Sequence, residues 1–154
     1  MIKKLIVLSA TLAVTACSTV TNQPVKIAPF AYNISASKND IYLTAVDCTL
    51  ELITAPTSNG QFFDYQDKES GRLAVAFQTK YPATFGVQIP LKTTMTIKAS
   101  DNKLNIRFGA LQQDLGSPIY WTNVYKEKDG STSEAEIKLK ETANSLSNCI
   151  RERA

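Results

Sequence analysis

Residues 87–99 carry the most regular pattern in the sequence, a strict alternation of two sets of side chains. One set contains Val87, Ile89, Leu91, Thr93, Met95, Ile97 and Ala99, and the other contains Gln88, Pro90, Lys92, Thr94, Thr96 and Lys98. Successive side chains of a β-strand point to opposite faces. The alternation therefore predicts a long antiparallel strand with one face in the core and the other in water.

Four shorter segments fit the same sheet. Residues 61–67, 72–80 and 104–110 also alternate, and turns at Glu69-Ser70-Gly71 and Asp101-Asn102 separate the strands. Residues 25–34 form a candidate first strand, with Phe30, Tyr32 and Ile34 on one face. Each strand keeps a polar face, which favours a sheet covered on one side.

Two segments have helical signals. Ser37 and Asp40 resemble a capping box before residues 38–53, and Ser133 with Glu136 forms one before the last helix. The apolar stripe of the first helix contains Ile41, Ala45, Cys48 and Leu52, and that of the last contains Ala135, Leu139, Thr142, Leu146 and Cys149. Residues 112–130 show no periodicity, and we expect an irregular connection.

The order of elements is strand, helix, four strands, helix. We expect an α+β two-layer sandwich, in which two helices cover one face of a five-stranded antiparallel sheet. Residues 25–154 would form this single domain, because a chain of this length is typical of one small domain.

The N-terminal segment has the features of a secretion signal. Lys3 and Lys4 precede an apolar run that is too short for the ~20 residues of a membrane-spanning helix. The run ends in Val14-Thr15-Ala16-Cys17, which resembles the lipobox of bacterial lipoproteins. The alternatives are a plain signal peptide with an incidental cysteine, or an uncleaved buried helix.

The lipobox implies removal of residues 1–16 and acylation of Cys17, by chains such as palmitate. Residues 17–24 would then be the lipidated N-terminus and a short tether, which reaches at most roughly 25 Å. Ser18 follows the lipidated cysteine, a pattern similar to that of Gram-negative lipoproteins exported to the outer membrane. We therefore expect the protein on the periplasmic face of the outer membrane.

Charge and composition exclude several functions. The chain of 154 residues has a formal charge of +3, and loss of Lys3 and Lys4 leaves +1 on the remaining 138 residues, which argues against a nucleic-acid partner. It contains no histidine, the commonest general base and metal ligand. We expect no metal, no cofactor and no enzymatic activity.

Three cysteines are present, at positions 17, 48 and 149. Lipidation of Cys17 leaves an even pair in an oxidising compartment, and both Cys48 and Cys149 lie on apolar helix faces. We expect a disulfide between the two helices. The alternative is two buried free thiols.

Several segments resemble a known bacterial family. They are Ser37-Lys38-Asn39-Asp40-Ile41-Tyr42, the hairpin Asp67-Lys68-Glu69-Ser70-Gly71-Arg72-Leu73, and the long hairpin from Lys92 to Ala99 with Asp101-Asn102-Lys103. Together they are similar to the domain of unknown function 4468, whose fold is like that of the TATA-box-binding protein. The resemblance implies this fold but no activity or catalytic residue, and a fold alone does not imply DNA binding.

Two surfaces are candidates for a partner. The polar face of the sheet would carry Lys92, Lys98 and Arg107, a basic surface for lipid headgroups, glycan or an acidic protein, or simply a solvated face. Tyr120, Trp121 and Tyr125 form either an interface patch or the closing end of the core. Asp64, Asp67 and Glu69 could serve glycoside hydrolysis only if two carboxylates converged.

The sequence favours a membrane-tethered, non-catalytic binding or accessory module of the cell envelope, with an envelope protein as partner. One alternative is a periplasmic inhibitor of a hydrolase such as lysozyme, which would use a protruding loop such as 112–130. The other is a carboxylate-based hydrolase.

Overall fold

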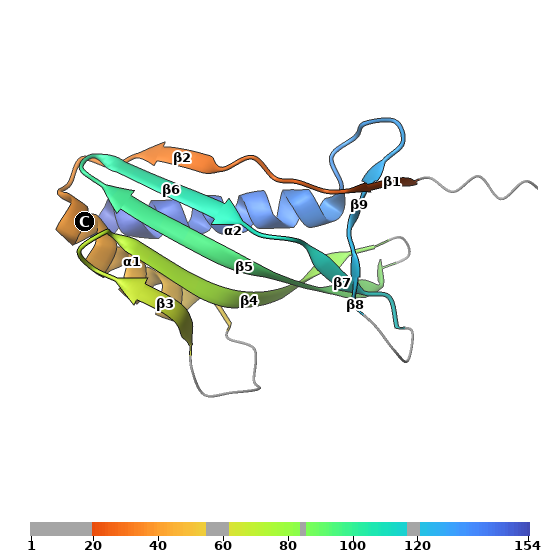
Figure 1. Ribbon diagram of the computed structural model, residues 1–154, viewed down its shortest axis with the longest axis horizontal. Helices are drawn as coiled ribbons and strands as arrows, with labels where there is room; N and C mark the ends of the chain where they lie inside the picture. The colour runs from red at the N-terminus through yellow and green to blue at the C-terminus, as the bar shows by residue number, and fades with distance from the viewer. Residues whose placement is uncertain (1–19, 55–61, 84–85, 117–120) are drawn as a thin grey trace, which may run out of the picture.

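Five antiparallel strands in the order β2-β6-β5-β4-β3 form the body of the main sheet. The structure is a computed structural model that describes residues 20–54, 62–83, 86–116 and 121–154. The five strands are β2 (Phe30–Asn33), β3 (Phe63–Asp67), β4 (Arg72–Pro82), β5 (Gln88–Ser100) and β6 (Lys103–Phe108). They correspond to the five predicted strands, and Figure 1 shows them side by side.

The alternating segment forms β5, the central strand. It pairs with β4 from Pro82↔Gln88 to Arg72↔Lys98, and with β6 from Met95↔Phe108 to Ser100↔Lys103. Leu91, Thr93, Met95, Ile97 and Ala99 are all buried, whereas the residues between them are exposed or half-buried. The predicted division of this strand into a core face and a water face is therefore confirmed from Leu91 to Ala99. Val87, which was predicted on the core face, instead precedes the strand and is 60% exposed.

Both helices begin at the predicted caps. Ser37 accepts a hydrogen bond from the Asp40 backbone and starts α1 (Lys38–Leu52). Ser133 and Glu136 form a reciprocal capping box at the start of α2 (Glu134–Arg153). These bonds satisfy backbone N–H groups that have no partner within the helix.

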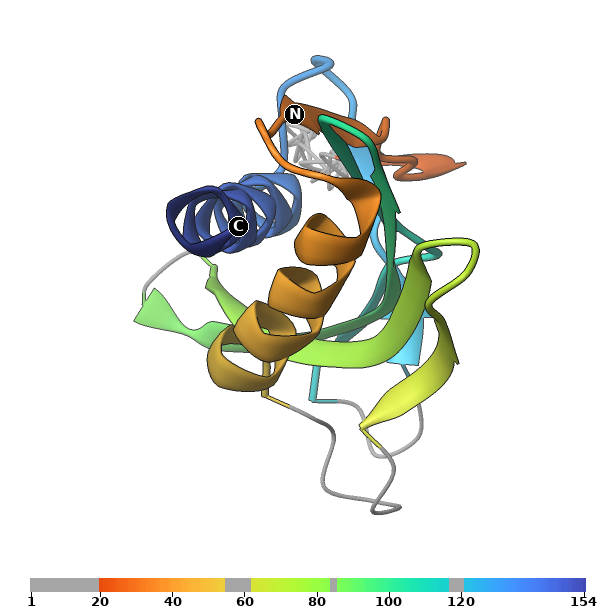
Figure 2. The same ribbon diagram turned by 90° about the vertical axis from the view of Figure 1, so that its left-hand side faces the viewer.

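The helices form one layer on one side of the sheet, as Figure 2 shows. α1 packs on β5, whereas α2 packs on β2, β4 and β6 and beside α1. Between them and the sheet lie fully buried Ile41, Leu73, Met95, Ile106 and Leu139. The predicted α+β two-layer sandwich is confirmed. Leu52, predicted in the buried stripe, is instead 45% exposed at the end of α1.

The connection after β6 differs from the prediction of an irregular segment. It contains β7 (Gln112–Asp114), β8 (Trp121–Asn123) and β9 (Tyr125–Glu127). β7 pairs with β5 and β8, so the main sheet has seven strands rather than the five predicted. Three-residue strands are too short for a periodic signal, and pairing with an existing edge stabilises them.

The expected tether also differs in part. Val20–Pro24 forms β1, which pairs with β9 in a separate two-stranded ribbon. Figure 1 shows this ribbon at the end of the sheet opposite the β5–β6 hairpin. Residues 20–24, which were predicted to belong to the tether, therefore form a strand that pairs with the domain. Neither described helix has the length and apolar character needed to span a bilayer.

Candidate functional site

The candidate site lies on the face of the sheet opposite the helices, which we call the open face. Leu73, Val75 and Phe77 of β4 point into the core, so the residues between them point outward. The same holds along β5 and β6. The open face of these strands carries Arg72, Ala74, Ala76, Gln78, Lys80, Lys92, Thr94, Thr96, Lys98, Asn105 and Arg107.

One part of this face is hollowed, and we call it the basic hollow. Its volume is about 410 Å³, and its lining consists of Pro29, Arg72, Thr96, Lys98, Asn105 and Arg107. Three of these six residues are cations, and none is a carboxylate. The hollow therefore has one sign of charge together with hydroxyl and amide groups.

The register of the sheet brings the cations together. Arg72 is directly opposite Lys98 across β4 and β5, and Arg107 is directly opposite Thr96 across β5 and β6. Side chains at directly opposed positions have Cβ atoms about 5 Å apart, and like charges there repel. The Arg72–Lys98 pair is thus an unfavourable pair in the isolated protein.

The nearest carboxylate in the sheet register is engaged elsewhere. Asp67 is opposite Arg72 in the β3–β4 pair, but its Oδ1 accepts hydrogen bonds from the Glu69 and Ser70 backbone at 2.9 and 3.1 Å. Hydrogen bonds from Ser70 hold the pKa of Asp67 below its ordinary value. The ion pairs among the described residues are Lys138–Glu141 and Glu51–Arg153, so none neutralises the basic hollow.

A second hollow continues along the open face. It has a volume of about 340 Å³, and its lining includes Gln78, Lys92, Thr94 and Gln112. The Lys92 ammonium lies 4.3 Å from the centroid of the Trp121 ring. This is a cation–π contact, which restrains Lys92. Lys92 therefore belongs to the same face as Lys98 and Arg107 but is already partnered.

The predicted aromatic patch is only partly described. Tyr120 lies outside the described residues. Trp121 is in β8 of the main sheet, whereas Tyr125 is in β9 of the separate ribbon, and both are half-buried. The aromatic pairs among the described residues do not join them.

The carboxylates considered for hydrolysis do not define a site in the described residues. The Asp67 carboxylate accepts hydrogen bonds from the backbone N–H groups of Glu69 and Ser70 in the β3–β4 turn. No group of acidic or cysteine side chains in the described ranges is arranged to hold a metal ion. Asp64, Asp67 and Glu69 do not line either of the two hollows.

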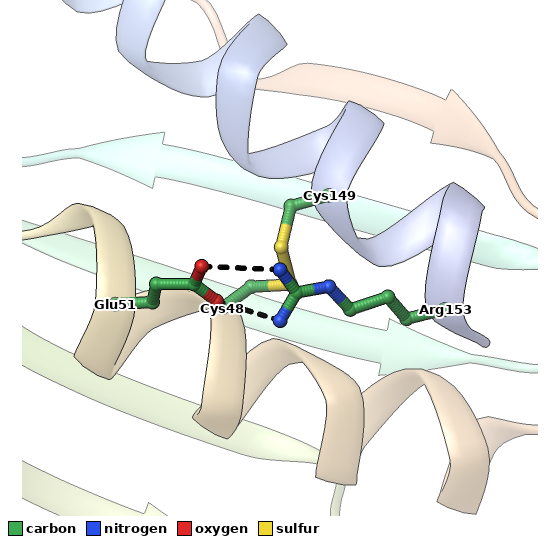
Figure 3. Close-up of polar contacts among 4 residues, drawn as sticks. All are labelled: Cys48, Glu51, Cys149 and Arg153. Atoms are coloured by element: carbon green, nitrogen blue, oxygen red, sulfur yellow. Dashed lines mark hydrogen bonds and ion pairs between the residues drawn. A yellow bond between two sulfur atoms is a disulfide. The ribbon is translucent and has the colours of Figure 1, made fainter.

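The predicted cysteine pair is joined. Cys48 of α1 and Cys149 of α2 form a disulfide with a Cα–Cα distance of 6.1 Å. Figure 3 shows that an ion pair between Glu51 and Arg153 lies beside it and links the same two helices. Cys17, the predicted lipidation site, lies outside the described residues.

Three polar lining residues of the basic hollow, Arg72, Thr96 and Asn105, were not among the predicted partner residues. All three could have been found from the strand alternation, because each lies next to buried residues of its strand, namely Leu73, Met95 and Ile97, and Leu104 and Ile106. Pro29 reaches the basic hollow because of the path of the chain before β2, and no local sequence pattern predicts that path.

The helices and the sheet form an α+β fold like that of TATA-box-binding-protein-like proteins, and solved structures share it. A TBP-like protein from Parabacteroides distasonis superposes with a TM-score of 0.59 at 10% identity, over 82% of this chain and 93% of that chain. A DUF4468 family protein from Bacteroides ovatus gives a TM-score of 0.58 at 10% identity, over 86% and 92%.

Identity at this level establishes the shared fold alone. Comparison of the sequence with protein families finds no match, and comparison with curated proteins finds none either.

Proposed function

We propose that the protein is a non-catalytic binding module of the bacterial cell envelope, anchored to the outer membrane by lipid on Cys17. Its binding surface is the open face of the sheet. The observation that carries the proposal is the basic hollow, in which three cations of adjacent strands converge without a carboxylate in the lining.

Several features support binding rather than catalysis. The hollow offers donors, from Arg72, Lys98, Arg107 and the Thr96 and Asn105 side chains, but no group that could act as a general base at neutral pH. The absence of histidine from the whole chain points the same way. Converging donors suit recognition of an anionic group.

The anchor is supported by the sequence before the fold. The lipobox ends at Cys17, and β1 begins at Val20, so the intervening chain spans at most about 10 Å. A domain attached in this way remains at the membrane surface and meets its ligand there.

The alternative of a hydrolase inhibitor has no comparable support. Its candidate inhibitory loop was 112–130, of which the described parts form β7, β8 and β9. β7 pairs with β5 and β9 pairs with β1, so these parts are integrated into sheets.

The anchor is tested by blocking lipoprotein signal peptidase with globomycin and fractionating the membranes. We expect an unprocessed precursor to accumulate, and Cys17→Ala to release the chain from the outer membrane. A chain whose length and location do not change under either treatment would contradict the anchor.

The binding surface is tested by photo-crosslinking of the full chain in its native membrane. A photoreactive residue in place of Thr96 lies in the basic hollow, whereas one in place of Ile137 lies on the exposed side of α2. We expect reproducible adducts from position 96 and none from position 137. Adducts from position 137 alone would contradict the proposal.

A further inference from the structure

We propose that the basic hollow binds the phosphate groups of anionic phospholipids, so that the open face lies against the membrane that carries the anchor. This inference rests on the proposed function and names the ligand class of the same surface.

The charge of the hollow favours an anionic ligand. Arg72, Lys98 and Arg107 converge from three adjacent strands, and Arg72 and Lys98 are directly opposed. Repulsion between opposed cations costs free energy in the unbound fold. An anion placed between them removes that cost and gains attraction to all three.

The hydrogen-bonding groups fit phosphate. A guanidinium presents paired N–H donors that match two phosphate oxygens, and Arg72 and Arg107 supply two such groups. Lys98 adds a point charge, and the Thr96 hydroxyl and Asn105 amide add neutral donors. Because a phosphate has several acceptor oxygens, it can use donors from more than one of these strands.

The rest of the face indicates a contact with headgroups rather than insertion into the bilayer. The large exposed apolar side chains of the described residues are Leu43, Leu50, Leu52, Tyr65, Val87, Leu115 and Ile137, and none belongs to β4, β5 or β6. Tyr65 of β3 is opposite Ala74 and so lies on the open face, where its hydroxyl donates a hydrogen bond to Asp67 at 3.1 Å. Attraction between cations and an anionic surface acts over about a Debye length and does not require buried apolar groups. Binding should therefore be sensitive to salt.

The anchor makes headgroups the nearest source of phosphate. Cys17 is three residues before β1, and β1 lies at one end of the sheet rather than over the helix layer (Figure 1). Because a short tether keeps the domain close to the membrane, the headgroups have a high effective concentration at its surface. Weak attraction of each headgroup is then sufficient to orient the domain.

The test is co-sedimentation of the mature chain with vesicles, using Cys17→Ser so that no acyl chain contributes. Vesicles contain phosphatidylcholine alone or with roughly one-third phosphatidylglycerol. At about 0.1 M salt we expect binding to the anionic vesicles only, and at about 1 M salt we expect release, because screening shortens the range of the charges.

A neutralised variant, Arg72→Gln/Lys98→Gln/Arg107→Gln, isolates the hollow. We expect binding to fall roughly 100-fold, since each basic residue at an anionic surface contributes about a factor of five. The matched control is Lys126→Gln/Lys128→Gln/Lys140→Gln, which makes the same change in net charge at exposed positions outside the hollow. This control should retain most of the binding.

A stability measurement separates binding from folding. Because the neutralised variant loses the Arg72–Lys98 repulsion, it should unfold at the same denaturant concentration as the parent or higher. Failure of this variant to fold would overturn the inference, since the cations would then be structural.

Three further outcomes would contradict phospholipid binding by the hollow. Equal binding to neutral and anionic vesicles, equal loss in the two triple variants, or binding to polyglutamate but not to anionic vesicles would overturn the inference. In each of these cases the proposed function survives if the position-96 adducts and the Cys17 anchor are observed. Absence of lipid from Cys17 in cells would instead contradict the proposed anchor, even if the chain binds anionic vesicles.

Discussion

Thr49 has an unusual polar environment in the helix layer. It is fully buried on α1, and among the described residues its Oγ1 is the buried side-chain oxygen with no hydrogen-bond partner. A buried hydroxyl without a partner costs free energy that a methyl group of the same shape does not.

We therefore expect Thr49→Val to stabilise the fold by about 1 kcal/mol. Valine and threonine have similar helix propensity, so the backbone contributes little to the difference. The measurement is the free energy of unfolding in urea. A loss of stability would show that the hydroxyl has a partner in solution.

The Glu51–Arg153 pair has a pH dependence that can be derived from its geometry. The Arg153 guanidinium donates to Glu51 at 2.6 and 3.1 Å, and these bonds hold the pKa of Glu51 below its ordinary value of 4.5. A carboxyl whose pKa is lower in the folded chain stabilises the fold above the unfolded pKa. That contribution disappears as the pH falls through the folded pKa.

We expect the melting temperature of Glu51→Gln to lie below that of the parent at neutral pH, and the difference to shrink as the pH falls below 4.5. Both residues are about half exposed, so the effect is small. Glu152→Gln is the control, because Glu152 is exposed on α2, beside Arg153, and takes no part in the ion pairs of the described residues. A difference that is independent of pH would contradict this account.

At the scale of elements, the β3–β4 hairpin meets the end of β5 at Gly71. Gly71 has φ +66°, and a Cβ there would lie 2.6 Å from the Ala99 carbonyl oxygen. The Ala99 N–H also donates to the Gly71 carbonyl oxygen at 2.8 Å. A side chain at this position would separate the hairpin from the strand.

Gly71→Ala should therefore destabilise the fold more than Gly130→Ala. Gly130 has φ +76° with nothing within 4 Å of an added Cβ, so alanine there costs only the left-handed backbone, about 1 to 2 kcal/mol. Loss of the Gly71 contact should add at least about 1 kcal/mol to that cost. Equal losses in chemical denaturation would argue against a tight contact at Gly71.

The disulfide is the covalent link between the two helices. Cys48 and Cys149 are 101 residues apart, and a crosslink over such a loop stabilises a fold by about 4 kcal/mol through the unfolded chain. We expect reduction, or Cys48→Ala/Cys149→Ala, to lower the free energy of unfolding by about this amount. Reductant should have no effect on the double variant.

The mass of the unfolded chain after alkylation without reductant provides an independent check. Only a disulfide protects both thiols once the fold is lost. Addition of alkyl groups at Cys48 and Cys149 under these conditions would contradict the crosslink.

The elements that the sequence predicted are those with long periodic patterns or explicit caps. β5 has a run of alternating residues, and both helices begin at Ser37 and Ser133 with their capping partners. The bulge between Phe63 and Tyr65 was not predicted, because an extra residue changes the register without a change of composition. β1 and β9 depend on each other for pairing and have no local signal.

At the scale of the whole molecule, the candidate site follows from the two-layer architecture. One layer of helices buries one face of the sheet, so the cations of the other face remain at the surface together. The alternation predicted the positions of Lys92, Lys98 and Arg107 on this face. The convergence of Lys98 and Arg107 with Arg72 depended on strand order and register, which the sequence does not specify.

Residue-by-residue mapping by NMR tests most directly whether the open face is the binding surface. The ¹⁵N-labelled mature chain with Cys17→Ser would be titrated with a short-chain phosphatidylglycerol. The account predicts shifts at Arg72, Thr96, Lys98, Asn105 and Arg107. Shifts confined to exposed Leu43 and Leu50 on α1, or no shifts at all, would contradict it.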